Sequence, residues 1–172
     1  MISANHYTST KKIQKYLAGE REGFSLVELI IVIAIMAILI GVIALAVIPN
    51  IQRSRESKDL STLDNVLSAC NVAAANAQMK VKEKAEVVYD KDSGALTITG
   101  SDAFKAQYVN AIGDGAQTLS SSVGSGKDIK ATVEITESNV AKITVWADGA
   151  DACKYTTNDD GSAKKLEVKS GE

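Results

Sequence analysis

A long apolar run limits what this chain can fold into. Residues 29–48 are 20 consecutive positions without a charged or strongly polar side chain. As an α-helix the run reaches roughly 30 Å, which is the thickness of the hydrocarbon core of a bilayer. No other stretch of the sequence is long and apolar enough to span a membrane. Glu28 stands directly before the run, so a spanning helix and an acid at its entrance must be explained together.

The segment before the run, residues 1–23, is polar and has an excess of Lys and Arg over Glu. This excess predicts that the N-terminus is cytoplasmic. An ordinary signal peptide cleaved after Ala46 and a plain signal-anchor helix are two interpretations of such a segment. The apolar run is long for a signal peptide and continues past Ala46, and an acid directly before it is atypical.

Residues 23–28, Gly-Phe-Ser-Leu-Val-Glu, resemble the prepilin cleavage signature of type IV pilins and their pseudopilin relatives. The resemblance implies a prepilin peptidase that cuts after Gly23 on the cytoplasmic side and methylates the new N-terminal residue, Phe24. Glu28 then becomes the fifth residue of the mature chain, as in that family. The motif is specific because it combines Gly-Phe, a Glu at this spacing and a following apolar run of spanning length. The resemblance covers about residues 20–60.

Pro49 is the only proline of the chain and follows the apolar run. It has no amide hydrogen and clashes with the carbonyl of Leu45, so we expect the helix to kink near Pro49. The pilin family often has a proline near mature residue 22, whereas Pro49 is mature residue 26 when Phe24 is the first. The resemblance therefore implies a kink about one turn later than usual.

Small residues form a narrow stripe on the predicted spanning helix. Ala34, Ala37, Gly41 and Ala44 follow one another at spacings of three, four and three. Ala37 and Gly41 are a pair of the kind that lets two helices approach closely. Two interpretations stay open, which are packing in a filament core and the ordinary abundance of small residues in membrane spans.

An amphipathic continuation of the helix is predicted over residues 51–85. Its apolar positions recur at intervals of three and four, and they are Leu60, Leu63, Val66, Leu67, Cys70, Ala73, Ala74 and Ala77. A mixed charge cluster precedes them at Arg53, Arg55, Glu56, Lys58 and Asp59. This cluster is either a solvated helix face or a source of ion pairs between subunits.

Beyond residue 85 the apolar period changes towards two, which indicates strands. We expect hairpins at 87–89 with 95–99, at 129–135 with 140–146, and at 153–157 with 165–169, with a short helix at 101–112 and a Gly/Ser-rich loop at 113–126. The predicted fold class is α+β, a long N-terminal helix packed on a small, mainly antiparallel sheet. The predicted divisions are a leader at 1–23, a transmembrane and assembly helix at 24–50, its amphipathic continuation at 51–85, and an exported β-rich part at 86–172.

Composition excludes several chemistries. The only histidine, His6, lies in the predicted leader, which removes histidine-based catalysis and most zinc or haem sites from the mature chain. The formal net charge of −2 gives no electrostatic case for nucleic acid. The two cysteines, Cys70 and Cys153, belong to a chain whose body is expected outside the cytoplasm, which suggests a disulfide, with two buried free thiols as the alternative.

The segment 156–167 has part of the spacing of a calcium loop. Asn158, Asp160 and Glu167 stand at ligand positions, but Thr156 replaces the first Asp and strands are expected on both sides. A polar turn is the favoured interpretation, and the resemblance leaves a weak calcium site as the alternative, because some pseudopilins hold calcium in a C-terminal loop. We expect no cofactor, no metal and no enzymatic activity.

The resemblance implies a structural subunit of a type IV pilus-like filament, polymerised through its N-terminal helix with Glu28 as an assembly residue. Its partners would be the prepilin peptidase, other copies or related pilins, the membrane, and a pilus or secretion assembly platform. It would be a single-pass protein of a bacterial or archaeal-type cell membrane, with its C-terminal part outside, and later part of an extracellular filament. The alternatives are a type II secretion pseudopilin and a membrane-anchored extracellular binding or enzymatic domain.

Overall fold

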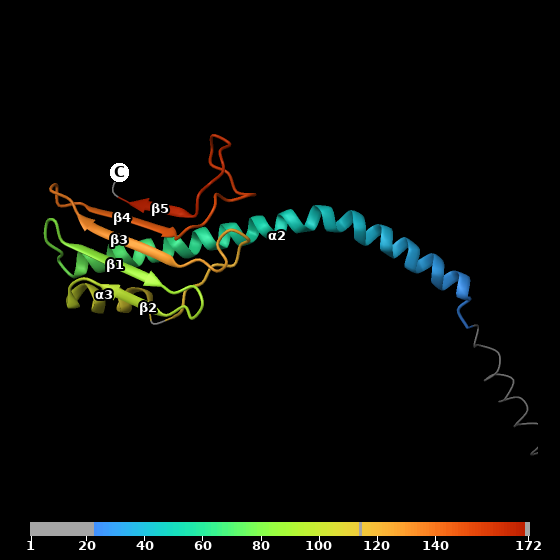
Figure 1. The fold of residues 1–172 in the computed structure, drawn as a ribbon, viewed down its shortest axis with the longest axis horizontal. Coiled ribbons are helices and arrows are strands. Elements are labelled where there is room, and N and C mark those ends of the chain that lie inside the picture. The colour runs from blue at the N-terminus through green and yellow to red at the C-terminus, as the bar shows by residue number, and fades with distance from the viewer. Residues whose placement is uncertain (1–22, 114, 171–172) are drawn as a thin grey trace, which may run out of the picture. The chain divides into compact units, whose positions relative to one another are not determined.

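The computed structural model describes residues 23–113 and 115–170 (Figure 1). In chain order the elements are α2 (Leu26–Asn76), β1 (Lys84–Tyr89), β2 (Leu96–Thr99), α3 (Asp102–Ile112), β3 (Ile129–Ile135), β4 (Ala141–Ala147) and β5 (Glu167–Ser170). The predicted α+β class is therefore confirmed. The chain divides into two compact units, with the boundary between Leu45 and Ala46, and each unit is described by itself.

The first unit contains most of the apolar part of α2, up to Leu45. Every residue from Leu26 to Ile43 is exposed in the single chain. By length and composition, α2 is the one helix in the described part of the chain that could cross a membrane. The helix continues through Pro49 without ending there, and the kink expected at this residue stays a prediction.

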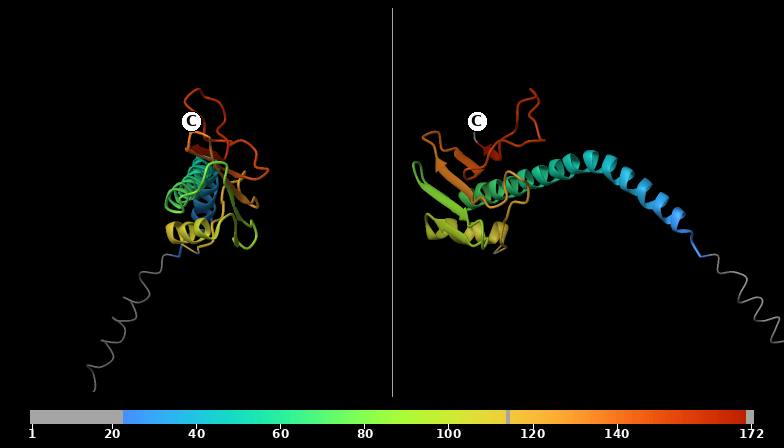
Figure 2. Two further views of the ribbon diagram at one scale, coloured as in Figure 1. Left: turned by 90° about the vertical axis from the view of Figure 1, so that its left-hand side faces the viewer. Right: turned by 45° about the vertical axis from the view of Figure 1, so that its right-hand side comes forward.

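The second unit contains a five-stranded antiparallel sheet in the order β2-β1-β3-β4-β5. The β1–β2 and β3–β4 hairpins confirm two of the predicted hairpins, and β3 spans the predicted residues. Along β3, Ile129, Ala131 and Val133 are buried, while the residues between them face outward. The C-terminal part of α2 and the short helix α3 pack on the buried face of the sheet (Figure 2).

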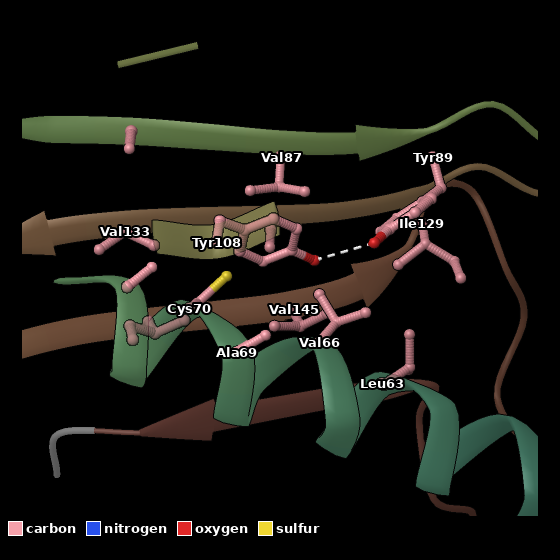
Figure 3. Close-up of a cluster of buried hydrophobic side chains, with 14 of the residues drawn as sticks. Leu63, Val66, Ala69, Cys70, Val87, Tyr89, Tyr108, Ile129, Val133 and Val145 are labelled. Atoms are coloured by element: carbon pink, nitrogen blue, oxygen red, sulfur yellow. Dashed lines mark hydrogen bonds between the residues drawn. The ribbon is translucent and has the colours of Figure 1, made fainter. Parts of the chain in front are cut away.

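The core joins both helices to this face (Figure 3). The predicted stripe of α2 is confirmed, with Leu60, Leu63, Val66, Cys70, Ala73 and Ala74 buried and Leu67 partly buried. Ala77 is also partly buried but follows the end of α2 at Asn76, so the helix ends before the predicted residue 85. Tyr108 of α3 and Tyr89 of β1 are fully enclosed, and their hydroxyl oxygens are 3.2 Å apart. This hydrogen bond satisfies two polar groups that would otherwise be buried without a partner.

The short helix α3 begins and ends with the local signals expected of it. The Ser101 side chain accepts a hydrogen bond from the Phe104 amide at 3.3 Å, which is an N-cap. Gly113 follows the last turn with a φ of 81°, a conformation that glycine adopts most readily. The helix predicted over 101–112 is thus confirmed.

The third predicted hairpin, 153–157 with 165–169, is found only close to its turn, where Cys153 and Thr156 exchange backbone hydrogen bonds with Lys164, and its pairing with 165–169 is wrong. The structure has an isolated bridge between Thr157 and Ala163, and β5 pairs with β4 instead. The free edge of β4 offers a complete row of backbone groups to β5. The amides of Lys154 and Tyr155 are instead bound to Glu56 on α2.

The predicted Cys70–Cys153 disulfide is also wrong, because both cysteines are free and buried. The Lys154 amide, next to Cys153, is bound to Glu56. Glu56 lies 14 residues before Cys70, which is about 21 Å along the helix axis. A disulfide needs Cα atoms within about 7 Å, so this geometry excludes the bond without a large backbone movement.

We therefore predict two free thiols in each chain. Burial raises the pKa of Cys70 to about 12 and that of Cys153 to about 11, which keeps both thiols protonated and poorly reactive near neutral pH. Chains unfolded without reductant should take up two alkyl groups, whereas folded chains should react slowly, as measured by intact mass. A peptide linking Cys70 to Cys153 in a non-reducing digest would contradict this.

Candidate processing and assembly site

The residues around the predicted cleavage bond lie at the start of α2. The helix begins at Leu26, so Gly23, Phe24 and Ser25 precede it in non-helical conformation. The Phe24 side chain is 91% exposed. The Gly23–Phe24 bond is therefore presented in an exposed, non-helical segment, which is the form in which a peptidase can bind a peptide. The rest of the predicted leader, residues 1–22, lies outside the described residues.

Ser25 and Glu28 form a capping box at this helix start. The Ser25 hydroxyl accepts a hydrogen bond from the Val27 amide at 3.3 Å, and the Ser25 amide donates to Glu28 Oε2 at 2.9 Å. A serine followed three residues later by glutamate is the usual sequence of this motif, and it satisfies amides that the helix itself cannot pair. Sequence reasoning missed the role of Ser25, although this spacing could have identified it.

The position of Glu28 also fits the charge of the helix end. It lies in the first turn of α2, where the helix dipole favours a negative group. Glu28 has a partner within its own chain in Ser25, so helix capping accounts for an acid at the start of an apolar run. The assembly role implied by the resemblance, pairing with the amine of Phe24, stays a prediction because that amine exists only after cleavage.

The small-residue stripe lies on the uncovered part of α2. Ala37 and Gly41 are both exposed, and a Cβ built on Gly41 would meet no atom within 4 Å. A larger side chain at Gly41 would therefore be harmless in the isolated subunit. The packing role predicted for this pair stays a prediction.

Two members of the charge cluster are placed differently from the prediction. Glu56 and Asp59 are 0% and 1% exposed, so they form neither a solvated face nor ion pairs with another subunit. They lie four residues before Leu60 and Leu63, on the same face of the helix as the apolar stripe. Acids at positions of the buried stripe were the signal that sequence reasoning overlooked.

The calcium-like segment forms a polar turn, as favoured from the sequence. Asp160 Oδ1 accepts hydrogen bonds from the Ser162 amide at 2.8 Å and the Ser162 hydroxyl at 2.6 Å, and Asn158 donates to the same hydroxyl. These bonds lower the pKa of Asp160, with the hydroxyl as the main cause. Within residues 23–113 and 115–170, the structure has no group of three or more His, Cys, Asp or Glu that could hold a metal ion.

One family model matches the chain, the prokaryotic N-terminal methylation motif, over residues 20–47. No curated protein and no solved structure matches it. The matched residues contain Gly23, Phe24, Glu28 and most of the apolar run. The chain thus carries the prepilin-type cleavage and methylation motif of type IV pilins and pseudopilins, which covers its start and leaves the sheet part unmatched.

The capping box predicts a local effect of Ser25. Replacing it in Ser25→Ala removes the acceptor for the Val27 amide, which should cost about 0.5–2 kcal/mol of local helix stability. In the uncleaved chain in detergent micelles, hydrogen exchange of the first amides of α2 should then accelerate, and Ser25→Thr should restore protection. Ser61→Ala, at an exposed position of the same helix, is the matched control. Unchanged exchange in Ser25→Ala would disprove the cap.

Proposed function

We propose that this protein is a structural subunit of a type IV pilus-like filament, cleaved between Gly23 and Phe24 and polymerised through α2. One observation carries the proposal, which is a prepilin-type motif at the start of a helix whose residues from Leu26 to Ile43 are all exposed. The motif supplies the processing step, and the uncovered helix supplies the surface for assembly.

The free-energy cost of exposing this helix to water favours a membrane, and then a filament, as its surroundings. Exposing some 20 apolar side chains to water would cost on the order of 30 kcal/mol, which exceeds the stability of a typical domain. The segment must therefore be covered by lipid or by other apolar helices. Both are apolar surroundings, so transfer from membrane to filament core need not cost much. The energy for extraction must come from a separate machine.

The excess of Lys and Arg in the leader supports a cytoplasmic N-terminus, and in this proposal the sheet part is exported. The subunit waits as a single-pass protein in the cell membrane and then enters an extracellular filament. Its partners in this proposal are the prepilin peptidase, further copies or related pilins, and the assembly platform. The subunit itself performs no catalysis and uses no cofactor.

A type II secretion pseudopilin is the second candidate, because the methylation motif supports it equally. It would form a short periplasmic filament instead of a surface pilus. The neighbouring genes distinguish the two, since a retraction motor indicates a pilus and a secretin-type export system indicates secretion. A membrane-anchored binding or enzymatic domain is a different class of protein, and such a domain does not need the Gly-Phe cleavage motif.

Processing is the first test of the proposal. In cells with an active prepilin peptidase, the mature protein should begin at Phe24 and carry one methyl group on its amine, as measured by N-terminal sequencing and intact mass. A chain starting at Val47 would indicate an ordinary signal peptide. An uncut chain would indicate a plain anchor, and either result would end the pilin proposal.

Glu28 is the second test, because capping and charge can be separated. Glu28→Gln keeps an oxygen for the Ser25 amide but removes the charge, whereas Glu28→Leu removes both. Both variants should enter the membrane normally, yet be recovered in the sheared filament fraction at least about tenfold less than wild type, the effect of losing one charged hydrogen bond. Ser25→Ala, which weakens the cap alone, is the control and should give a higher filament yield than either Glu28 variant. Normal filament yield from Glu28→Gln would leave Glu28 with a capping role only.

A further inference from the structure

The first buried residues along α2 are acids. Glu56 and Asp59 precede every buried apolar residue of the helix, and both are almost completely enclosed. In the part of the chain that the structure describes, neither side chain belongs to an ion pair. Enclosing a carboxylate without a basic partner is unfavourable unless other donors replace water. The replacement donors are backbone amides of two distant loops.

Glu56 holds residues 154 and 155. Its Oε1 accepts a hydrogen bond from the Lys154 amide at 2.9 Å, and its Oε2 accepts one from the Tyr155 amide at 3.0 Å. Arg53, one turn earlier on α2, donates from Nε to the Tyr155 carbonyl at 3.2 Å. One turn of α2 therefore binds both the amide and the carbonyl of Tyr155, in the segment before β5.

Asp59 holds a second loop in the same way. Its Oδ1 accepts from the Ser120 amide at 2.8 Å and its Oδ2 from the Ser121 amide at 2.9 Å. The Ser122 amide donates to Oε1 of Gln52 at 3.3 Å. The loop comes so close that a Cβ at Gly124 would lie 2.6 Å from Asp59 Oδ2, so only glycine fits there.

We propose that Gln52, Arg53, Glu56 and Asp59 form a clasp that fastens these two loops to α2 and transmits tension between the helix and the sheet part. Tension on α2 arises only if the subunit works in a filament, so this part rests on the proposed function. The fastening of the loops does not depend on it.

The position of the clasp favours this role. It begins three residues after Pro49, and Glu56 is the first enclosed residue of a helix that is exposed from Leu26 to Ile43. A pull on the apolar half of α2 therefore reaches the rest of the fold at the clasp first. Apolar contacts further along the helix are non-directional and tolerate sliding. Charge-assisted hydrogen bonds are directional and stronger than neutral ones, so they resist displacement along the axis.

The two carboxylates act on different parts of the chain. The loop bound by Glu56 leads into β5, which has four residues and pairs with β4. The loop bound by Asp59 leads into β3 at the centre of the sheet. Loss of one carboxylate should therefore open its own loop and leave the other closed, which separates a clasp from a general contribution to stability.

The test uses limited trypsin digestion of the full chain in detergent micelles. Lys154, Lys164 and Lys165 report on the loop of Glu56, and Lys127 reports on the loop of Asp59. Glu56→Gln places an amide group against the Tyr155 amide. Cleavage at Lys154, Lys164 and Lys165 should then rise about tenfold or more, which is the change expected for one lost charged hydrogen bond. Asp59→Asn should do the same at Lys127 alone. Asp64→Asn, an exposed acid on the same helix, should change neither.

Equal opening of both loops in each variant, or opening of neither, would overturn the clasp. If a variant does not fold, wild-type hydrogen exchange decides, because the amides of Ser120, Ser121, Lys154 and Tyr155 should be the most protected of their loops. Fast exchange at these four amides would equally overturn it.

Tension is tested by pulling single full-length chains between handles at the N-terminus and the C-terminus. Glu56→Gln should lower the force of the first rupture, whereas Asp64→Asn should leave it unchanged. An unchanged rupture force in Glu56→Gln would remove the mechanical role. This measurement needs no filament, so its failure is distinct from a failure of the filament proposal, which the start of the mature chain decides.

Discussion

The uncovered apolar half of α2 is the constraint on which the rest of the structure depends. A helix exposed from Leu26 to Ile43 cannot stay in water, so it needs lipid or other apolar helices around it. The same continuous helix then supplies one wall of the core from Leu60 to Ala74. One helix thus connects a region that needs partners to a region that folds by itself. Glu28 stands at the start of the first region, and Glu56 and Asp59 stand at the start of the second.

Sequence periodicity predicted the parts of the fold that depend on local pattern. The three-and-four spacing of Leu60, Leu63 and Val66 identified the buried face of α2, and the alternation around Ile129 identified β3. These patterns succeed because each residue's burial follows from the geometry of its own element. The motif around Gly23 was equally visible, since its information lies in a few adjacent residues.

The errors concern residues whose partners are far away in sequence. The position of Glu56 on the buried stripe indicated burial, but nothing local shows that the amides of Lys154 and Tyr155, about 100 positions later, would bind its carboxylate. The same contact explains the false disulfide, because it fixes Lys154, beside Cys153, far from Cys70 along the helix. One long-range interaction thus accounts for the burial of Glu56 and for the false disulfide.

The acid at the start of α2 and the acid at the start of its buried part use the same chemistry with different consequences. Glu28 and Glu56 are each bound by backbone amides, and neither forms an ion pair within the described residues. Amides satisfy hydrogen bonding but leave the negative charge uncompensated. At Glu56 both carboxylate oxygens are bound and enclosed, so this carboxylate can interact only with the loop that contains Lys154 and Tyr155. At Glu28 the bond from Ser25 uses Oε2 and the residue is exposed, so a carboxylate oxygen is left for a donor from outside the chain. The enclosed acid is therefore suited to hold the fold together, and the exposed acid to meet a partner.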